Sequence, residues 1–188
     1  MIRAAEWQAE AFCSATEFLA SEHRRGPGCI VLDIKMPGMT GPELQEALSN
    51  AECCLPIIFL SGHGDVPTTA EAMKRGAVDF LTKPVDREDL LAAIRVSLAK
   101  DAECREARAE VVSIRERIVT LTPREHEIMT YVITGMLNKQ IATELGISVE
   151  TVKIHRGRVT EKLGTESVAE LVRLTESAGV KPVRRCKP

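Results

Sequence analysis

The sequence has few aromatic residues, no long apolar run and no paired cysteine motif. Aromatic residues make up 3% of the chain, too few for the stacking surfaces on which proteins bind single-stranded nucleic acids. No apolar stretch is long enough to span a bilayer, and the N-terminus lacks the basic and apolar regions of a secretory signal. These shortages predict a cytoplasmic protein that makes no membrane contact.

The six cysteines include no Cys-x-x-Cys pair and no accompanying histidine cluster. This arrangement argues against both a zinc site and a disulfide framework. The cysteines are therefore predicted to be reduced thiols that pack as small apolar residues. A response of the neighbours Cys53 and Cys54 to oxidants remains an alternative interpretation.

The length of 188 residues and the 44% hydrophobic content fit two small packed domains. Charge is divided unevenly between them. Residues 1–118 carry 14 basic and 19 acidic side chains, whereas residues 119–188 carry 11 and 8. An acidic half followed by a basic half fits a regulatory domain joined to a domain that binds a polyanion.

Three short apolar segments, each ending in a polar residue, alternate with helical segments in the first half. Such alternation predicts a parallel sheet with helices on both faces. Ligands and chemistry in these sheets lie beyond the carboxyl ends of the strands, where the polar residues fall here. The segments are Cys29–Asp33, Pro56–Ser61 and Ala77–Lys83.

Helices and a further strand are predicted around these segments. Gln8–Phe12 is predicted to be a short strand, and Ser14 caps a helix that runs to about His23. Asp86 begins another helix, with acidic residues in its first turn. Residues 99–118 are charged and contain no glycine or proline, which predicts a helical linker.

The three polar residues and their flanks resemble the receiver domain of two-component response regulators. The runs Ser61–Pro67 and Gly76–Pro84 resemble more narrowly the FixJ branch of that family. Taken singly, an aspartate, a serine or a lysine in such a loop is usually a turn former or a solvated side chain. Their occurrence on three successive strand ends favours the receiver interpretation.

The resemblance implies a role for each of these residues. Asp33 is the expected phospho-acceptor for a sensor histidine kinase. Ser61 and Lys83 are expected to bind the phosphoryl group, and Phe80 takes the position of the aromatic switch residue. An inward-facing strand phenylalanine is equally a core residue.

The receiver is short at its front when compared with the family pattern. Only 28 residues precede Cys29, and the predicted strand and helix already occupy them. Met1–Glu6 is therefore interpreted as the tail of the first helix, and the first strand is expected to be absent. The expected fold is α/β, a flavodoxin-like doubly wound parallel sheet in an N-terminally incomplete receiver over residues 1–98.

The resemblance also implies Mg²⁺ for phosphorylation, and here the expected site is partial. Asp33 would supply one ligand and the backbone carbonyl near Lys35 another. The family's acidic pair has no counterpart, because Glu6 and Glu10 are the only carboxylates near the start and neither ends a predicted strand. Magnesium is usually held by one or two carboxylates together with water and phosphate oxygens.

Residues 119–180 carry the signals of an all-α domain of four short helices. Thr122 and Pro123 begin the first helix, and Gly146 separates the second from the third. Two short helices around a glycine turn, the second bearing cations, are typical of a helix-turn-helix motif. This segment resembles the LuxR-type DNA-binding domain, in which Val149–Leu163 would be the recognition helix.

The LuxR resemblance implies that Lys153 and Ile154 meet base edges in the major groove of double-stranded DNA. Other side chains would contact phosphates, which position a protein without reading sequence. For an isolated helix a solvated charged face would be the simpler interpretation, but the capped helix before it favours DNA. The predicted remaining DNA contacts are Lys139, Thr151, Arg156 and Arg158.

Together these features predict a DNA-binding response regulator that controls transcription and is not an enzyme. Its expected partners are double-stranded DNA, a sensor histidine kinase and a second copy of the chain, with RNA polymerase as a further candidate. Dimerisation is expected through the helix Ser167–Ser177, because Leu171 and Leu174 give it more apolar surface than a small domain needs to cover its own core. A second dimer surface is expected on the receiver face of Pro67–Arg75 and Val78–Thr82.

Two alternatives remain open. The chain is either a phosphorylation-independent DNA-binding regulator whose receiver only mediates interaction or dimerisation, or a phosphate-accepting adaptor for a kinase. The basic tail, residues 181–188, is predicted to be disordered.

Overall fold

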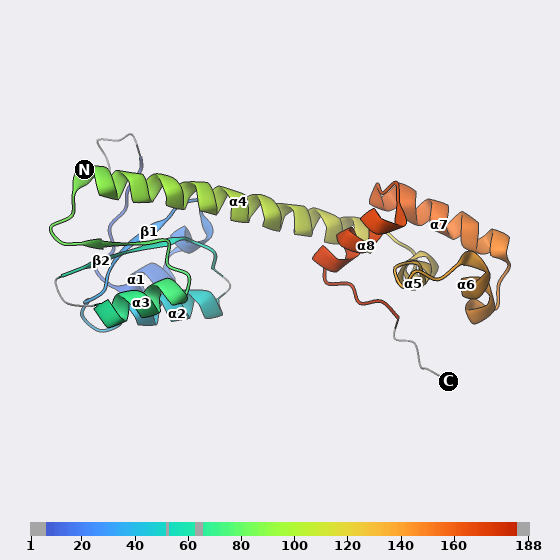
Figure 1. The fold of residues 1–188 in the computed structure, drawn as a ribbon, viewed down its shortest axis with the longest axis horizontal. Coiled ribbons are helices and arrows are strands. Elements are labelled where there is room, and N and C mark those ends of the chain that lie inside the picture. The colour runs from blue at the N-terminus through green and yellow to red at the C-terminus, as the bar shows by residue number, and fades with distance from the viewer. Residues whose placement is uncertain (1–6, 52, 63–65, 184–188) are drawn as a thin grey trace. The chain divides into compact units, whose positions relative to one another are not determined.

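The structure is a computed structural model that describes residues 7–51, 53–62 and 66–183. It divides into two compact units, residues 1–106 and 107–188, joined by the helix α4 (Arg87–Val119) (Figure 1). Within the described ranges, no helix is both long and apolar enough to cross a membrane. The predicted helix tail at 1–6 and most of the predicted disordered tail lie outside the described residues.

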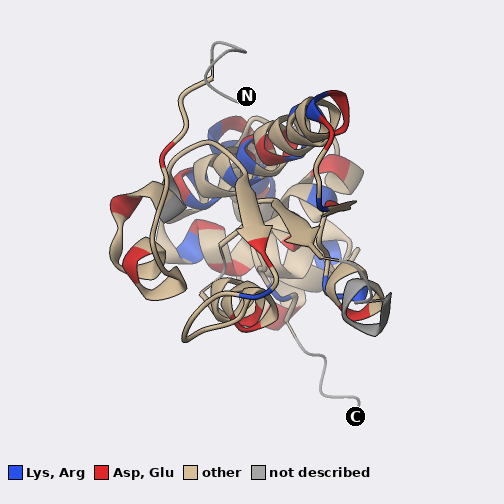
Figure 2. Ribbon diagram, turned by 90° about the vertical axis from the view of Figure 1, so that its left-hand side faces the viewer, with Lys and Arg blue, Asp and Glu red and all other residues tan. Residues whose placement is uncertain are grey.

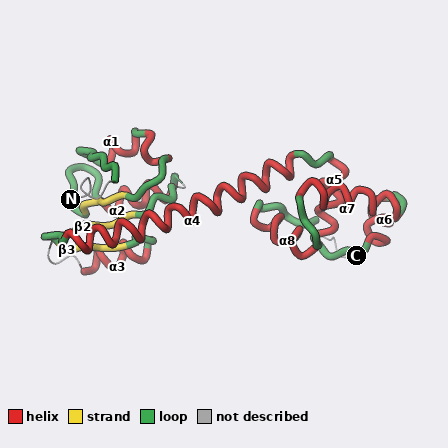
Figure 3. Tube along the Cα trace, turned by 90° about the horizontal axis from the view of Figure 1, so that it is seen from above, coloured by secondary structure: helices red, strands yellow, loops and turns green. Residues whose placement is uncertain are grey.

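The first unit contains a parallel sheet with the strand order β1-β2-β3. Its strands are β1 (Ile30–Asp33), β2 (Ile57–Ser61) and β3 (Asp79–Thr82), drawn in yellow in Figure 3. In the sheet register Asp33 pairs with Leu60, and Ser61 pairs with Thr82. The carboxyl ends of all three strands therefore lie along one edge.

Helices cover both faces of this sheet, because successive strand residues point to opposite sides. Figure 1 shows α2 (Gly41–Asn50) and α3 (Val66–Lys74) below the strands and α4 above them. On the α4 side, Ile58 packs with Leu90, Ala93 and Ile94. The core on the other side includes Phe18, Leu32, Leu44, Leu48, Phe59 and Ala72.

The predicted strand Gln8–Phe12 is wrong, because residues 7–12 form no regular structure. A strand needs a neighbour for its N–H and C=O groups, and in the described residues β1 pairs only with β2. The segment is held by side chains instead. Phe12 meets Phe18 edge-on at 5.2 Å, and Trp7 packs against the α4 side of the core.

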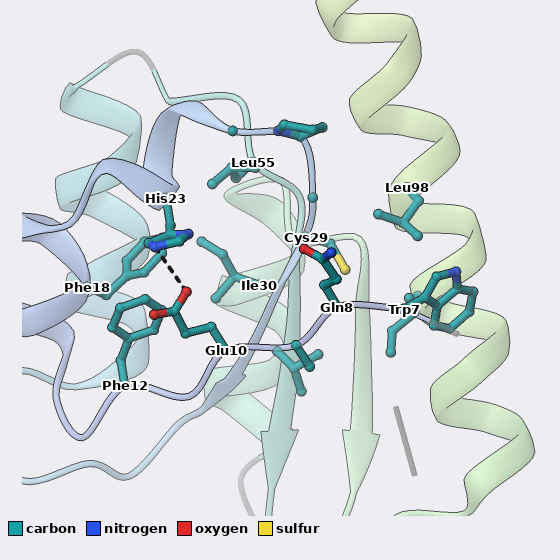
Figure 4. A pocket seen from close by; sticks show the side chains of 16 residues that line it. Trp7, Gln8, Glu10, Phe12, Phe18, His23, Cys29, Ile30, Leu55 and Leu98 are labelled. Carbon is teal, nitrogen blue, oxygen red and sulfur yellow. Dashed lines mark ion pairs between the residues drawn. The ribbon is translucent and has the colours of Figure 1, made fainter. Parts of the chain in front are cut away.

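The helix predicted from Ser14 to about His23 is shorter than expected. The helix α1 (Ala15–Ala20) is followed by a 3-10 turn, η2 (Glu22–Arg25). The predicted cap is present, since the Ser14 hydroxyl accepts the Glu17 N–H and the Glu17 carboxylate accepts the Cys13 N–H. A cavity of about 750 Å³ lies beside β1, bordered by residues 7–12, α1 and α4 (Figure 4).

The predicted linker at 99–118 is helical as a continuous part of α4. The helix begins after Asp86, whose carboxylate accepts the N–H of Glu88 at 2.7 Å. Farther along, Asp101 is 3% exposed and accepts the Gly28 N–H at 2.9 Å and Arg105 Nε at 2.7 Å. These contacts hold the middle of α4 against the turn that leads into β1.

The second unit is all-α, and the predicted fold class of a parallel α/β sheet followed by a helical domain is confirmed. It contains, besides the end of α4, the helices α5 (Pro123–Val132), α6 (Asn138–Leu145), α7 (Val149–Leu163) and α8 (Val168–Ser177). Its fully buried core residues include Ile128, Met129, Ile141, Val152 and Leu163.

Local capping chemistry sets the boundaries of these helices. Thr122 is the N-cap of α5, as the sequence predicts, and it forms a reciprocal capping box with Glu125. Gly146 and Gly164 end α6 and α7 with φ of 63° and 66°, a left-handed conformation that glycine adopts without steric cost. The glycine turn thus fixes where α7 begins.

Candidate functional site

The carboxyl edge of the sheet brings three of the predicted site residues together. Asp33 ends β1, Ser61 ends β2, and Lys83 directly follows β3. The Lys83 ammonium donates to the Asp33 carboxylate in an ion pair, and the Lys83 N–H donates to the Ser61 carbonyl at 2.7 Å. One anionic and one cationic group therefore share an accessible edge.

The Asp33 carboxylate is ionised and open to solvent. Its side chain is 35% exposed and that of Lys83 is 45% exposed. Partial burial alone would raise the pKa of Asp33, but the hydrogen bonds from Lys83 and from the backbone N–H groups of Lys35 and Ile34 hold that pKa below its usual value. At neutral pH this group is an available nucleophile.

Glycine at position 41 allows the start of α2 to approach this edge. A Cβ at Gly41 would lie 2.7 Å from the Asp33 carbonyl oxygen and 2.9 Å from the Phe59 ring. The Gly41 N–H donates to the Ile34 carbonyl at 3.0 Å. This close backbone approach fixes the loop that follows Asp33.

Two further predicted residues, Ser61 and Phe80, lie on the strands that form this edge. Ser61 is 1% exposed, and its hydroxyl donates to the Gly62 carbonyl at 2.8 Å. Phe80 is half-buried and packs against the core beneath the sheet, and its N–H donates to Asp79. Both residues therefore lie on the strands that the sequence predicts, and the Ser61 hydroxyl points toward the carbonyl of the next residue, Gly62.

The described residues contain no group of three His, Cys, Asp or Glu side chains that could hold a metal ion. Glu10, one of the two carboxylates considered for the acidic pair, lies 3.0 Å from His23 beside the cavity at β1 (Figure 4). Glu6 lies outside the described residues. Asp33 fits the role of a single carboxylate ligand, which Mg²⁺ accepts when water and phosphate oxygens complete its shell.

A second site lies on the helix-turn-helix formed by α6 and α7. Lys153 is 59% exposed and pairs with Glu150 at 3.2 Å, and Ile154 is 57% exposed although it is apolar. Arg158 is also exposed. The predicted base-reading side chains therefore point to solvent, while Val152 and Val159 of the same helix are buried.

The side chains predicted to contact phosphates differ in exposure and in their hydrogen-bond partners. Lys139 is exposed. Thr151 Oγ1 lies 2.8 Å from Ser148 Oγ, and the Arg156 guanidinium donates to Asn138 Oδ1 at the start of α6. Sequence reasoning missed this link between α6 and α7. The one signal for it was a small polar residue at the first position of α6.

An ion pair that the sequence did not reveal joins α7 to α5. Its carboxylate is buried, whereas its lysine is partly exposed. Lys162 donates to Glu125 at 2.6 Å, and the Glu125 side chain is 2% exposed. The hydrogen bonds from Lys162 and from the Thr122 N–H lower the pKa of Glu125 to about 2. The capping-box spacing could have identified Glu125 but not its lysine partner.

The predicted surplus apolar face of α8 is only partly present. Leu171 is 1% exposed and belongs to the core of the second unit, and Leu174 packs against that core. The expectation is therefore wrong for Leu171, because Leu171 lies on the face of α8 that packs against the core of the second unit. Val168, 38% exposed, is the large apolar residue that α8 presents to solvent.

Among the described residues, helices of the first unit carry charges of both signs, such as Glu71 with Arg75 and Asp101 with Arg105. Figure 2 colours the acidic and basic residues on the ribbon. In the second unit, α7 carries Lys153, Arg156 and Arg158 within six residues. Basic residues clustered on one helix are the electrostatic signature of a DNA-binding element.

Comparisons with known families match the two parts of the chain that carry these sites. Residues 1–95 match the response regulator receiver domain, and residues 119–175 match the bacterial regulatory proteins of the luxR family. Nodulation protein W of Bradyrhizobium diazoefficiens is 42% identical over 96% of this chain and 79% of its own length. The response regulator protein TodT of Pseudomonas putida is 42% identical over 94% of this chain and 78% of its own length.

Solved structures give the same assignment. The response regulator StyR is 44% identical, with a TM-score of 0.76 over 93% of this chain and 88% of that chain. Full-length FixJ from B. japonicum is 38% identical, with a TM-score of 0.52 over 94% of this chain and 87% of that chain. The chain therefore belongs to the two-component response regulators of the FixJ type, DNA-binding transcriptional regulators that join a receiver domain to a LuxR-type domain.

Proposed function

We propose that a sensor histidine kinase phosphorylates Asp33, and that this modification controls how α7 binds double-stranded DNA. The observation that carries the proposal is the exposed Asp33 carboxylate, ion-paired with Lys83 at the carboxyl edge of the sheet. Receiver domains generally use such a carboxylate with Mg²⁺.

The chemistry follows from the charges at this edge. The phosphoryl group would leave a histidine nitrogen of the kinase and form a bond with a carboxylate oxygen of Asp33. The Lys83 ammonium, which pairs with the free carboxylate, would then pair with the phosphoryl oxygens and neutralise their negative charge. Mg²⁺, when bound by Asp33 and the backbone carbonyl of Lys35, supplies further neutralisation.

The switch would use Ser61 and Phe80. The Ser61 hydroxyl, now donating to Gly62, would rotate to donate to a phosphoryl oxygen. The half-buried Phe80 would then turn toward the space that Ser61 vacates. A phosphoryl group can shift this equilibrium only by binding one arrangement better than the other.

The DNA-binding half would read sequence through Lys153 and Ile154, by donation to guanine acceptors and contact with a thymine methyl. Lys139, Thr151, Arg156 and Arg158 would contact phosphates. Arg156 would do so without leaving Asn138, so that it locks α6 and α7 together on the DNA backbone. A symmetric dimer would present two such helices to a two-fold operator, and RNA polymerase is the further partner proposed.

The test is intact mass after incubation with acetyl phosphate and Mg²⁺. A phosphoryl adduct on the parent and none on Asp33→Asn supports the proposal, and Lys83→Ala should accumulate less adduct. No adduct on a parent that still binds DNA would favour the phosphorylation-independent regulator instead. The position of Glu10 beside His23, away from Asp33, is the observation that keeps this second function open.

A kinase adaptor that rarely meets DNA is distinguished by a separate variant. Lys153→Ala should abolish regulation by a DNA-binding protein and leave an adaptor intact, because the lysine is exposed on α7 and remote in sequence from the receiver.

A further inference from the structure

Three cysteine side chains line one pocket of about 350 Å³ in the first unit. Cys53 and Cys54 lie in the loop between α2 and β2, and Cys104 lies on α4. Pro56 and Val78 also line the pocket, which places it at the amino ends of the strands. It therefore lies at the opposite edge of the sheet from Asp33 and is separate from the phosphorylation site.

The pocket does not suit a metal ion. Among the residues that the structure describes, no three metal-ligating side chains gather closely enough to bind one. The pocket is open to reagents, since Cys54 is exposed and Cys53 and Cys104 are half-buried. Lys100 also lines the wall of the pocket. The thiolate form of a cysteine is the form that reacts with oxidants.

Cys29 offers a contrasting thiol in the same unit. It is half-buried at the start of β1. Burial, reinforced by the Asp101 carboxylate, raises the pKa of the Cys29 thiol. Cys29 therefore remains protonated at neutral pH and serves as the internal control for reactivity.

We propose that Cys54 and Cys104 form a reversible disulfide when the protein meets hydrogen peroxide. Disulfides of cytosolic proteins are usually of this transient, redox-sensing kind. The Cys54 thiolate would attack the peroxide oxygen to give a sulfenic acid and water. The Cys104 thiol would then attack the sulfenic sulfur and release a second water, so that two thiols and one peroxide yield one disulfide and two waters.

The consequence follows from where Cys104 lies. Because α4 continues from the first unit into the second, a disulfide would tie the joining helix to the loop before β2. It would also close a loop of about 50 residues, which restricts the unfolded chain. Oxidised protein should therefore unfold at a higher urea concentration than reduced protein.

The test treats the full chain with hydrogen peroxide and maps the products with trypsin. The sequence places Cys104 alone in the peptide Asp101–Arg105 and Cys54 in the peptide Met36–Lys74. We expect these two peptides to appear cross-linked in the parent and in the Cys29→Ser and Cys53→Ser variants. The cross-link should disappear in Cys54→Ser and Cys104→Ser and after treatment with dithiothreitol.

Three results would overturn the proposal: a disulfide within the peptide Met36–Lys74, Cys104 that is oxidised without a cross-link, and Cys29 that reacts as fast as Cys54. The parent alone decides among these three results, by mass of the peptides after alkylation of the remaining thiols. The Cys53→Ser and Cys54→Ser variants then decide which of the two neighbouring cysteines is cross-linked, and a cross-link that persists in Cys54→Ser would also overturn the proposal. Fluorescence of Trp7, the single tryptophan, reports whether each variant retains the fold of the first unit.

Discussion

Replacing Asp101 by alanine should destabilise the first unit by removing the contacts that hold α4 to the turn before β1. The carboxylate is 3% exposed and accepts the Gly28 N–H at 2.9 Å and Arg105 Nε at 2.7 Å. Arg105 in turn donates to the Gly26 carbonyl. The Asp101 carboxylate therefore bonds both the turn before β1, through Gly28, and α4 itself, through Arg105.

The size of the effect follows from how exposed each partner is. A hydrogen bond to a charged group contributes about 1.5–3 kcal/mol, and the Gly28 N–H would lose such a bond in a partly buried site. Arg105 is 37% exposed, so water can replace its lost partner and the ion pair itself adds only about 0–1 kcal/mol. We expect a loss of about 2–3 kcal/mol in the free energy of unfolding.

Urea unfolding followed by Trp7 fluorescence measures this loss in the first unit alone, because Trp7 packs in its core. With a denaturant slope of about 1–3 kcal/mol per molar urea, the midpoint should fall by roughly 0.7–3 M. Glu103→Ala is the matched control, since Glu103 is an exposed carboxylate on the same helix. A change of under 0.5 kcal/mol for Asp101→Ala, or an equal change for Glu103→Ala, would refute the reasoning.

Three shorter predictions concern the second unit. Lys153→Ala should weaken specific DNA binding by about 1–3 kcal/mol, measured by fluorescence anisotropy, and an unchanged affinity would remove Lys153 from the interface. Gly157→Lys should strengthen binding and steepen its salt dependence, because nothing lies within 4 Å of a Cβ at that position; weaker binding would contradict this. Since the pKa of Glu125 is lowered to about 2, its stabilisation is complete above its ordinary value of 4.5 and is lost as the pH falls toward 2. Circular dichroism of parent and Glu125→Gln should show the acid loss in the parent only.

Strands and helix boundaries were predictable because their causes are local. The three strands are continuous apolar runs, as expected for a parallel sheet buried on both faces. Thr122 and Ser148 are N-caps whose hydroxyls accept the N–H of the residue three positions later, so the capping can be recognised from the sequence alone. The same locality made the strand ends at Asp33 and Ser61 identifiable.

The failures share a non-local cause. Gln8–Phe12 was predicted to be a strand, but only Phe12 in it is a strand-favouring residue. A strand also needs a partner, and sequence pattern alone does not supply one. The Gly28 contact with Asp101 joins residues 73 positions apart, and the Lys162 contact with Glu125 spans 37. Leu171 was predicted to lie on the surface, but it packs in the core of the second unit. Which face of α8 is buried depends on the positions of the other helices, which the sequence of α8 does not contain.

The candidate site divides in the same way. The sequence identified the residue types at the sheet edge, and the structure adds that Lys83 already neutralises Asp33 while the Ser61 hydroxyl is turned toward Gly62. It likewise adds that Arg156 is engaged by Asn138. These orientations depend on rotamers and neighbours, which residue spacing does not encode.

The most direct test of the central claim is the DNA affinity of one preparation before and after phosphorylation by acetyl phosphate, with Asp33→Asn carried through the same steps. The account predicts that affinity for a specific operator changes in the parent in proportion to the fraction that carries the phosphoryl group, and that Asp33→Asn shows no change. Equal affinities for phosphorylated and unphosphorylated parent would contradict the account, because Asp33 would then not control α7.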